Sequence, residues 1–276
     1  MGRIRLTQVF PFLLPLRKRQ RKFCFYLKMR LDRNRYAHTI QTECLPYTVF
    51  SAQSALINPD SGFDLQYQYN KVFNLKLASQ PMDHLVIQPG ETFSFWQLVR
   101  HADRQTPYKE GLVLSDGKIQ PIQGGGLCQL SNTLFWLFLH SPLTVIERHG
   151  HAIEAFPTPN QGDIPPGVDA TVSEGWLDLK VRNQTDLPFQ LIFSFDEETM
   201  SIHLLTTQQL ALCYHIEGRH LHYTRKKSHI YEQIDIYRQI LDRVSRQPLA
   251  DTLLYHNRCE IQYALPAGTP IEEEIA

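Results

Sequence analysis

A glycine-rich stretch before one cysteine is the part of the sequence best suited to chemistry. Residues 123–132 read QGGGLCQLSN, so that Gly124, Gly125 and Gly126 come just before Cys128. Glycines adopt backbone angles closed to other residues, and successive amides in such a turn can point at one anion. The apolar run TLFWLFLH behind them is typical of a buried helix, whose N-terminus favours thiolate over thiol. The pattern indicates a nucleophilic thiol with oxyanion donors beside it.

The same stretch also has a purely structural interpretation. The glycines could simply let the chain turn under a sheet, with Cys128 as a small buried hydrophobe, which is the usual role of a free cysteine. The glycine triplet and the Gln-Leu-Ser-Asn continuation favour a functional role.

A nucleophilic thiol needs a base, and the segment ERHGH at residues 147–151 offers two histidines. If TVIERHGH is a strand, His149 and His151 point to the same face, because side chains alternate along a strand. One imidazole could then deprotonate the thiol while the other orients a substrate. Asp169, in PPGVDATV, is the carboxylate that we expect to orient a histidine, with Glu147 as the fallback. Two surface histidines flanking a glycine turn are the alternative.

A zinc site is the metal alternative for the same residues. Cys128, His149 and His151 could meet on one zinc ion, since thiolate and imidazole are its common ligands. Otherwise we expect no cofactor. The five cysteines are odd in number, are widely spaced and include no C-x-x-C pair, which favours a reducing compartment and a cytoplasmic location.

The N-terminal segment is strongly basic although the whole chain has a formal net charge of zero. Residues 1–36 hold eleven lysines and arginines and one acid, a net charge of +10, so the remaining residues carry −10. LTQVFPFLLPL is too short to span a bilayer and no cleavage site follows it, so we expect neither a transmembrane anchor nor a signal peptide. Residues 1–36 could rest on an anionic membrane at its inner face, or form a solvated helix packed on the domain. Without an aromatic-basic module, we expect no nucleic-acid partner.

The remaining sequence predicts an α+β fold. YKEGLVLSDGKIQP indicates a β-hairpin closed by Asp116 and Gly117, which delivers the chain to the glycines. FDLQYQYNKVFNLKLAS fits either a strand pair or an amphipathic helix. Polar and apolar residues alternate over 176–182, which indicates a half-buried strand, and the NQTD turn after it predicts an antiparallel partner.

We expect one mixed or antiparallel sheet flanked by the helix that begins near Cys128. Three regions follow from the changes in composition: a basic apolar N-terminal segment over 1–44, a core domain over 45–210 and a strand-rich C-terminal extension over 211–276.

Several of these segments together resemble the VanW family. They are LTQVFPFLLPLRK, ETFSFWQLV, GGGLCQLSNTLFWLFLH, ERHGHA and DATVSEGWLDLKVRN, and they cover nearly the whole chain. The resemblance implies a bacterial protein linked to vancomycin resistance and to the peptidoglycan of the cell wall, but it implies no particular reaction. The positions that match the family's motifs are Gly124, Gly125, Gly126, Cys128, Gln129, His149, His151 and Asp169.

Three hypotheses of function follow. The first is a cysteine-dependent hydrolase or acyl-transferase acting on a cell-wall peptide or precursor, with Cys128 as nucleophile, one of the two histidines as base and Asp169 orienting it. The three glycines and Gln129 would then bind the substrate. The second is a non-catalytic binding module for cell-wall peptide or glycan, and the third is the zinc site.

Overall fold

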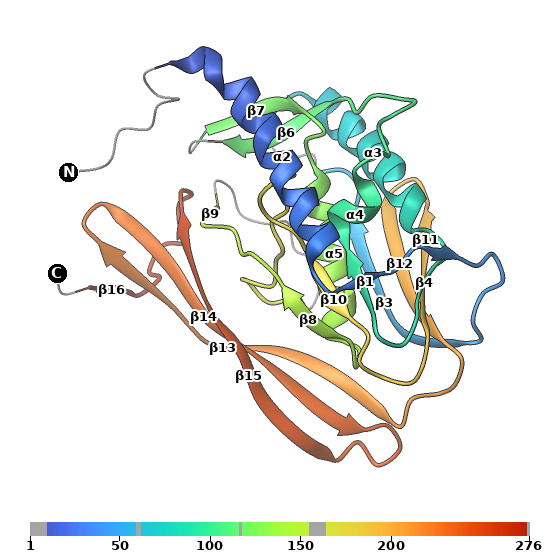
Figure 1. Cartoon of the computed structure of the whole chain (residues 1–276). Helices are drawn as coiled ribbons and strands as arrows, with labels where there is room; N and C mark the ends of the chain where they lie inside the picture. The colour runs from blue at the N-terminus through green and yellow to red at the C-terminus, as the bar shows by residue number, and fades with distance from the viewer. Residues whose placement is uncertain (1–9, 59–61, 116–117, 155–163, 275–276) are drawn as a thin grey trace.

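The computed structural model describes residues 10–58, 62–115, 118–154 and 164–274, and it has the predicted α+β fold (Figure 1). Its helices are η1 (Pro11–Leu13), α2 (Leu14–Leu31), α3 (Leu65–Ser79), η3 (Gln80–Met82), α4 (Phe95–Val99) and α5 (Leu127–Leu139). Among the helices in these residues, none combines the length and apolar character that a membrane span requires.

Two sheets build the body of the molecule. The first has the order β1 (Arg35–Tyr36), β5 (Glu91–Ser94), β10 (Lys180–Arg182) and β8 (Thr144–Glu147), and is antiparallel except for the β1–β5 pair. The second is antiparallel throughout, with the order β2 (Thr39–Ile40), β4 (Leu85–Ile87), β11 (Phe189–Phe195), β12 (Thr199–Thr206) and β3 (Tyr47–Ala55).

A third sheet comes almost entirely from the C-terminal residues. Its order is β16 (Ile271–Glu273), β13 (Leu212–Lys226), β14 (His229–Asp242), β15 (Pro248–Ile261) and β9 (Ile153–Glu154). The three long strands are antiparallel, and the short β16 and β9 add to the two edges in parallel. Because β9 follows the H-x-H segment directly, this sheet holds that segment beside the body of the molecule.

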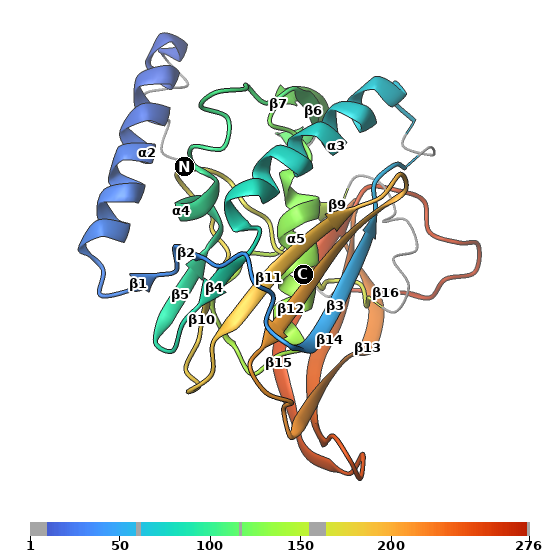
Figure 2. The ribbon, with the colours of Figure 1, turned by 90° about the vertical axis from the view of Figure 1, so that its right-hand side faces the viewer.

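Helix α5 runs through the middle of the molecule and contacts β3, β12 and β8 (Figure 2). Residues around its whole circumference are buried, which agrees with its all-round apolar sequence. A helix fixed in this way by close packing holds its first turn, and therefore Cys128, in one place. Helix α3, the segment that the sequence left undecided, covers the start of α5, and the carboxylate of Asp64 caps its first turn.

Two strand predictions were wrong at their boundaries. The strand predicted through TVIERHGH ends at Glu147, so His149 and His151 do not share a strand face. The strand predicted over 176–182 is regular only over β10. The next strand, β11, lies in a different sheet, so it is not the antiparallel partner that the turn predicted. The predicted hairpin exists as β6 (Glu110–Ser115) and β7 (Lys118–Gln123), while its turn, Asp116 and Gly117, lies outside the described residues.

The three consecutive glycines each have a separate structural reason. Gly124 and Gly126 have φ angles of 80° and 97°, in the region that side chains disfavour. Gly125 instead lies against the backbone of Gly111 in β6, where an added Cβ would lie 2.2 Å from the Gly111 carbonyl carbon. The buried side chain of Asn74 in α3 fixes this contact, donating to the carbonyl oxygens of Lys109 and Gly125 at 2.9 and 3.0 Å.

Replacing Gly125 with alanine is expected to lower the free energy of unfolding by about 3 kcal/mol, because both sides of the clash are backbone. Gly62→Ala is the control: alanine is disfavoured there only by the positive φ of 73°, because no atom of the described residues lies within 4 Å of the added Cβ. Urea unfolding of both variants measures the difference. Equal losses in the two variants would contradict the close contact between Gly125 and Gly111.

Candidate active site

Cys128 is the second residue of α5 and its side chain is half-buried. Its sulfur lies 3.8 Å from the carbonyl oxygen of Val172. Two further residues of α5 hold the same segment: the Ser131 hydroxyl donates to the carbonyl of Ala170 at 2.5 Å, and the Asn132 side chain accepts from the Ala170 amide at 2.8 Å. The first turns of α5 therefore fix the position of residues 169–172 relative to the thiol.

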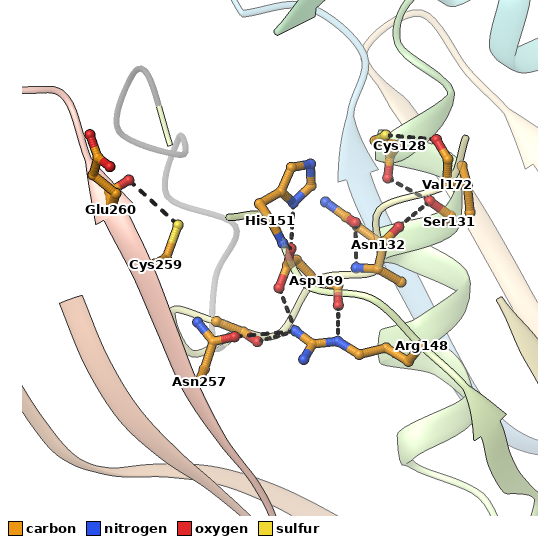
Figure 3. A network of polar contacts seen from close by, with 12 residues as sticks. Cys128, Ser131, Asn132, Arg148, His151, Asp169, Val172, Asn257, Cys259 and Glu260 are labelled. Carbon is orange, nitrogen blue, oxygen red and sulfur yellow. Dashed lines mark hydrogen bonds and ion pairs between the residues drawn. The ribbon is translucent and has the colours of Figure 1, made fainter. Parts of the chain in front are cut away.

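The segment held in this way presents Asp169 to His151 (Figure 3). One carboxylate oxygen of Asp169 accepts the backbone amide of His151 at 2.6 Å and also contacts the ring Nδ1 of the same residue. The carboxylate thus fixes both the backbone and the ring of His151. With Nδ1 donating to Asp169, the Nε2 nitrogen is left to face another partner.

Arg148 completes the support of Asp169 from the other side. Its guanidinium donates to the second carboxylate oxygen and to the carbonyl of Asp169, at 2.5 and 2.6 Å, and to the carbonyl of Gly167 at 2.9 Å. The guanidinium also lies 4.3 Å from the centre of the Tyr255 ring in β15. A carboxylate with charged partners on both sides stays ionised in a buried position.

The electrostatics favour an imidazolium at His151. Burial alone would lower the pKa of His151, but hydrogen bonding to Asp169 and Cys128 and the negative charges of both raise it from 6.5 to about 10. For Asp169 the effects are reversed: burial acts to raise its pKa, but His151 and Arg148 hold that pKa below its usual value. The imidazole of His151 therefore contacts the Asp169 carboxylate through Nδ1, and the nearby Cys128 thiol adds to the rise of its pKa.

His149 belongs to a different group of residues. Its Nε2 lies 3.1 Å from a carboxylate oxygen of Glu147, which also forms an ion pair with Lys180 at 2.9 Å. Each of the two carboxylates considered from the sequence thus contacts one histidine, Asp169 with His151 and Glu147 with His149. The structure brings together Cys128, His151 and Asp169.

The glycine amides are largely used within the protein. Those of Gly124 and Gly125 donate to the carbonyls of Lys109 and Ile122, both at 3.0 Å. The amides of Leu127 and Cys128, at the start of α5, have no acceptor among the residues that the structure describes. An anion beside the thiol would therefore meet these two helix-start amides, and not those of the first two glycines.

Gln129, which the sequence predicts to bind substrate, instead connects α5 to β3 through two hydrogen bonds. Its amide nitrogen donates to the Ser54 hydroxyl at 2.9 Å and to the Ala55 carbonyl at 2.6 Å. A substrate would have to compete with both contacts.

Sequence reasoning missed the residues that support the site. Arg148 stands inside the quoted ERHGH segment, and its position between a glutamate and a histidine was the available signal. Lys71 had no such signal. Its aliphatic stem covers the glycine turn, since a Cβ on Gly126 would lie 2.3 Å from the Lys71 Cγ. Burial lowers the pKa of Lys71 to about 8, and its amine has no acidic partner in the described residues.

The proposed zinc ligands do not come together in this arrangement, because His149 contacts Glu147. Among the described residues, no group of three or more His, Cys, Asp or Glu side chains is placed to hold a metal ion. The zinc hypothesis stays a prediction that metal analysis of the purified protein can decide.

Comparison with known proteins identifies the family. A family model described as VanW like protein matches residues 70–205, which include Cys128, His151 and Asp169. The chain is 50% identical over 273 residues to the vancomycin B-type resistance protein VanW of Enterococcus faecalis (strain ATCC 700802 / V583), covering 99% of both chains. The chain belongs to the VanW family.

Part of the chain is also similar to a second bacterial protein. The uncharacterized protein YoaR of Bacillus subtilis (strain 168) is 36% identical over 115 residues, which are 42% of this chain and 36% of YoaR. No solved structure matches the chain. The resemblance to the VanW family seen in the sequence is thus confirmed.

Stability is expected to depend on pH through His151. Its pKa in the folded protein, about 10, lies above the ordinary 6.5, so its stabilisation is complete below pH 6.5 and is lost as the pH rises toward 10. Urea unfolding of the wild type and of His151→Gln across this range measures the contribution. The gap in stability between the two should narrow as the pH rises. A gap that stays constant or widens would show that His151 is neutral in the folded protein.

Proposed function

We propose that this VanW-family protein is a cysteine-dependent hydrolase or acyl-transferase that acts on peptidoglycan-type peptides or precursors in glycopeptide resistance. The arrangement that carries the proposal is the series Cys128, His151 and Asp169, in which the Asp169 carboxylate contacts the His151 ring and the half-buried Cys128 thiol helps to raise the pKa of that ring. The name of the Enterococcus faecalis relative supports the context of vancomycin resistance.

In the proposed reaction the Cys128 thiolate attacks a carbonyl carbon of the peptide, and the tetrahedral oxyanion is held by the amides of Leu127 and Cys128. His151 then gives its Nε2 proton to the leaving amine or alkoxide as the carbonyl re-forms, which leaves a thioester on Cys128. Water or an acceptor amine attacks this thioester and loses a proton to His151, and the thiolate departs. Asp169 keeps the imidazole in the orientation that both proton transfers need.

A second candidate, the non-catalytic binding module, is favoured by a separate observation. The amides at the start of α5 and the side-chain stem of Lys71 lie beside the same residue of the glycine turn, Gly126, and the Lys71 amine has no acidic partner in the described residues. Such a turn suits an anionic group, for example the terminal carboxylate of a peptide. Binding of this kind would survive removal of the thiol.

The two candidates differ in whether a covalent intermediate forms. The experiment incubates the protein with a muramyl-peptide precursor and follows both the peptide and the intact protein by mass spectrometry. The proposal predicts a shortened or transferred peptide and an acyl adduct on Cys128, both absent in Cys128→Ser. Peptide binding without turnover in the wild type would reject the enzyme in favour of the binding module. Equal turnover in the wild type and in Cys128→Ser would show that the reaction does not use Cys128 as its nucleophile.

A further inference from the structure

Helix α2 lies along the outer edge of the molecule and packs on it by one face (Figure 2). Met29 on that face is only 4% exposed. Tyr26 donates a hydrogen bond to Glu174 at 3.0 Å, and Lys22 forms an ion pair with the same carboxylate. The guanidinium of Arg21 lies 4.0 Å from the ring centre of Trp176. One face of α2 is therefore accounted for by contacts within the chain.

The opposite side of α2 carries an exposed apolar stripe. Its members are Leu16, Phe23, Leu27 and Leu31, which are 66%, 67%, 40% and 73% exposed. Their spacings of seven and four residues place them on one side of a helix, turned away from Met29. Phe12, 75% exposed in η1, extends the stripe toward the N-terminus. Large apolar side chains gathered in this way mark an interaction surface.

Positive charge borders the stripe on both sides. Helix α2 contains seven lysines and arginines and no acidic residue. By the helical period, Arg17 and Lys28 lie along one border, and Arg19 and Arg30 lie along the other. Apart from Lys22, none of the seven has a carboxylate partner in the described part of the chain.

The positive charge of α2 indicates which kind of partner can cover the apolar stripe. A second copy of α2 laid against the first would bring two sets of seven cations together, and like charges in contact oppose association. A lipid surface with anionic headgroups instead accepts apolar side chains at the acyl boundary and pairs with cations beside them. We propose that this protein binds an anionic membrane surface through the exposed stripe of α2. The proposal is independent of the reaction at Cys128.

The test is sedimentation of the full chain with lipid vesicles, made of phosphatidylcholine alone or of phosphatidylcholine with phosphatidylglycerol. The wild type should bind the anionic vesicles and be released by high salt. Phe23→Ser with Leu27→Ser should weaken that binding about tenfold or more, because two inserted apolar side chains are lost. Val244→Ser with Leu249→Ser is the matched control, since these residues are 93% and 60% exposed at the far end of the third sheet.

Retained binding in the control together with loss in the α2 variant supports the proposal. Equal binding of the two variants overturns it, and so does a wild type that leaves the anionic vesicles unbound. The wild type could also form dimers that the α2 substitutions dissociate, without binding vesicles. That result overturns the proposal and shows that a second copy of the chain covers the stripe.

Discussion

Replacing His151 with glutamine is expected to lower peptide turnover by about 10³-fold, because the proton transfers to and from the substrate lose their carrier. Glutamine retains hydrogen-bonding groups and fits a similar space, so the contacts with Asp169 need not collapse. The rate of peptide release per molecule of folded protein is the measurement, and circular dichroism confirms the fold.

His149→Gln is the control for this prediction, since it removes the other histidine of the same H-x-H segment. His149 contacts Glu147 and, within the described residues, makes no hydrogen bond to the Cys128 thiol, so its replacement should leave turnover largely unchanged. If His149→Gln were the more damaging of the two, the assignment of His151 as the proton carrier would be wrong.

Replacing Arg148 with methionine is expected to lower the free energy of unfolding by about 3–5 kcal/mol, the usual loss when one partner of a buried ion pair is removed. The Arg148 side chain is only 14% exposed. Its loss leaves the buried carboxylate of Asp169 with one charged partner and frees the carbonyls of Asp169 and Gly167. Urea unfolding near neutral pH measures the change.

Arg225→Met provides the comparison, because Arg225 pairs with Glu273 at the surface and is 42% exposed. Exposed pairs contribute at most about 1 kcal/mol. The double variant Arg148→Met with Asp169→Asn should recover part of the loss, since the unpaired charge is then removed as well. Similar losses for the Arg148 and Arg225 variants would mean that Arg148 does not hold a buried charge.

The sequence predicted the types of the site residues better than their pairing. Cys128, His151 and Asp169 were all candidates, because a nucleophile, a base and an orienting carboxylate are the residue types that the proposed chemistry needs. The predicted strand placed His149 and His151 on one face and left the choice between them open, but the strand ends at Glu147. Arg148 stabilises the non-strand conformation after Glu147, because its side chain binds residues 167–169. The local sequence cannot reveal this contact between distant segments.

Asp178 shows a second reason why pattern reasoning failed. Alternation placed it on a polar, solvent-facing side of a strand, yet it is fully buried. Its carboxylate accepts the Ser94 hydroxyl at 2.6 Å and the Trp96 amide at 3.1 Å, which caps the start of α4. Burial raises the pKa of Asp178 to about 6 despite these bonds. A buried cap partner from a distant segment breaks the rule that polar residues face water.

The long strands and the central helix were predictable for the opposite reason. In α5 and in β13, β14 and β15, residue type, periodicity and packing all favour the same structure. The glycine turn was predictable as a turn, but its contact with Gly111 was not, because that contact depends on how β6 approaches it.

The most direct test of a functional Cys128–His151 pair is the rate at which iodoacetamide alkylates each cysteine of the native protein near neutral pH. Cys24 and Cys44 are free and exposed, so they serve as ordinary thiols in the same sample, and peptide mass spectrometry reports each site separately. The account predicts that Cys128, although less exposed, reacts faster than both, and that His151→Gln removes this advantage. A Cys128 that reacts more slowly than Cys24 and Cys44 in the wild type would contradict it.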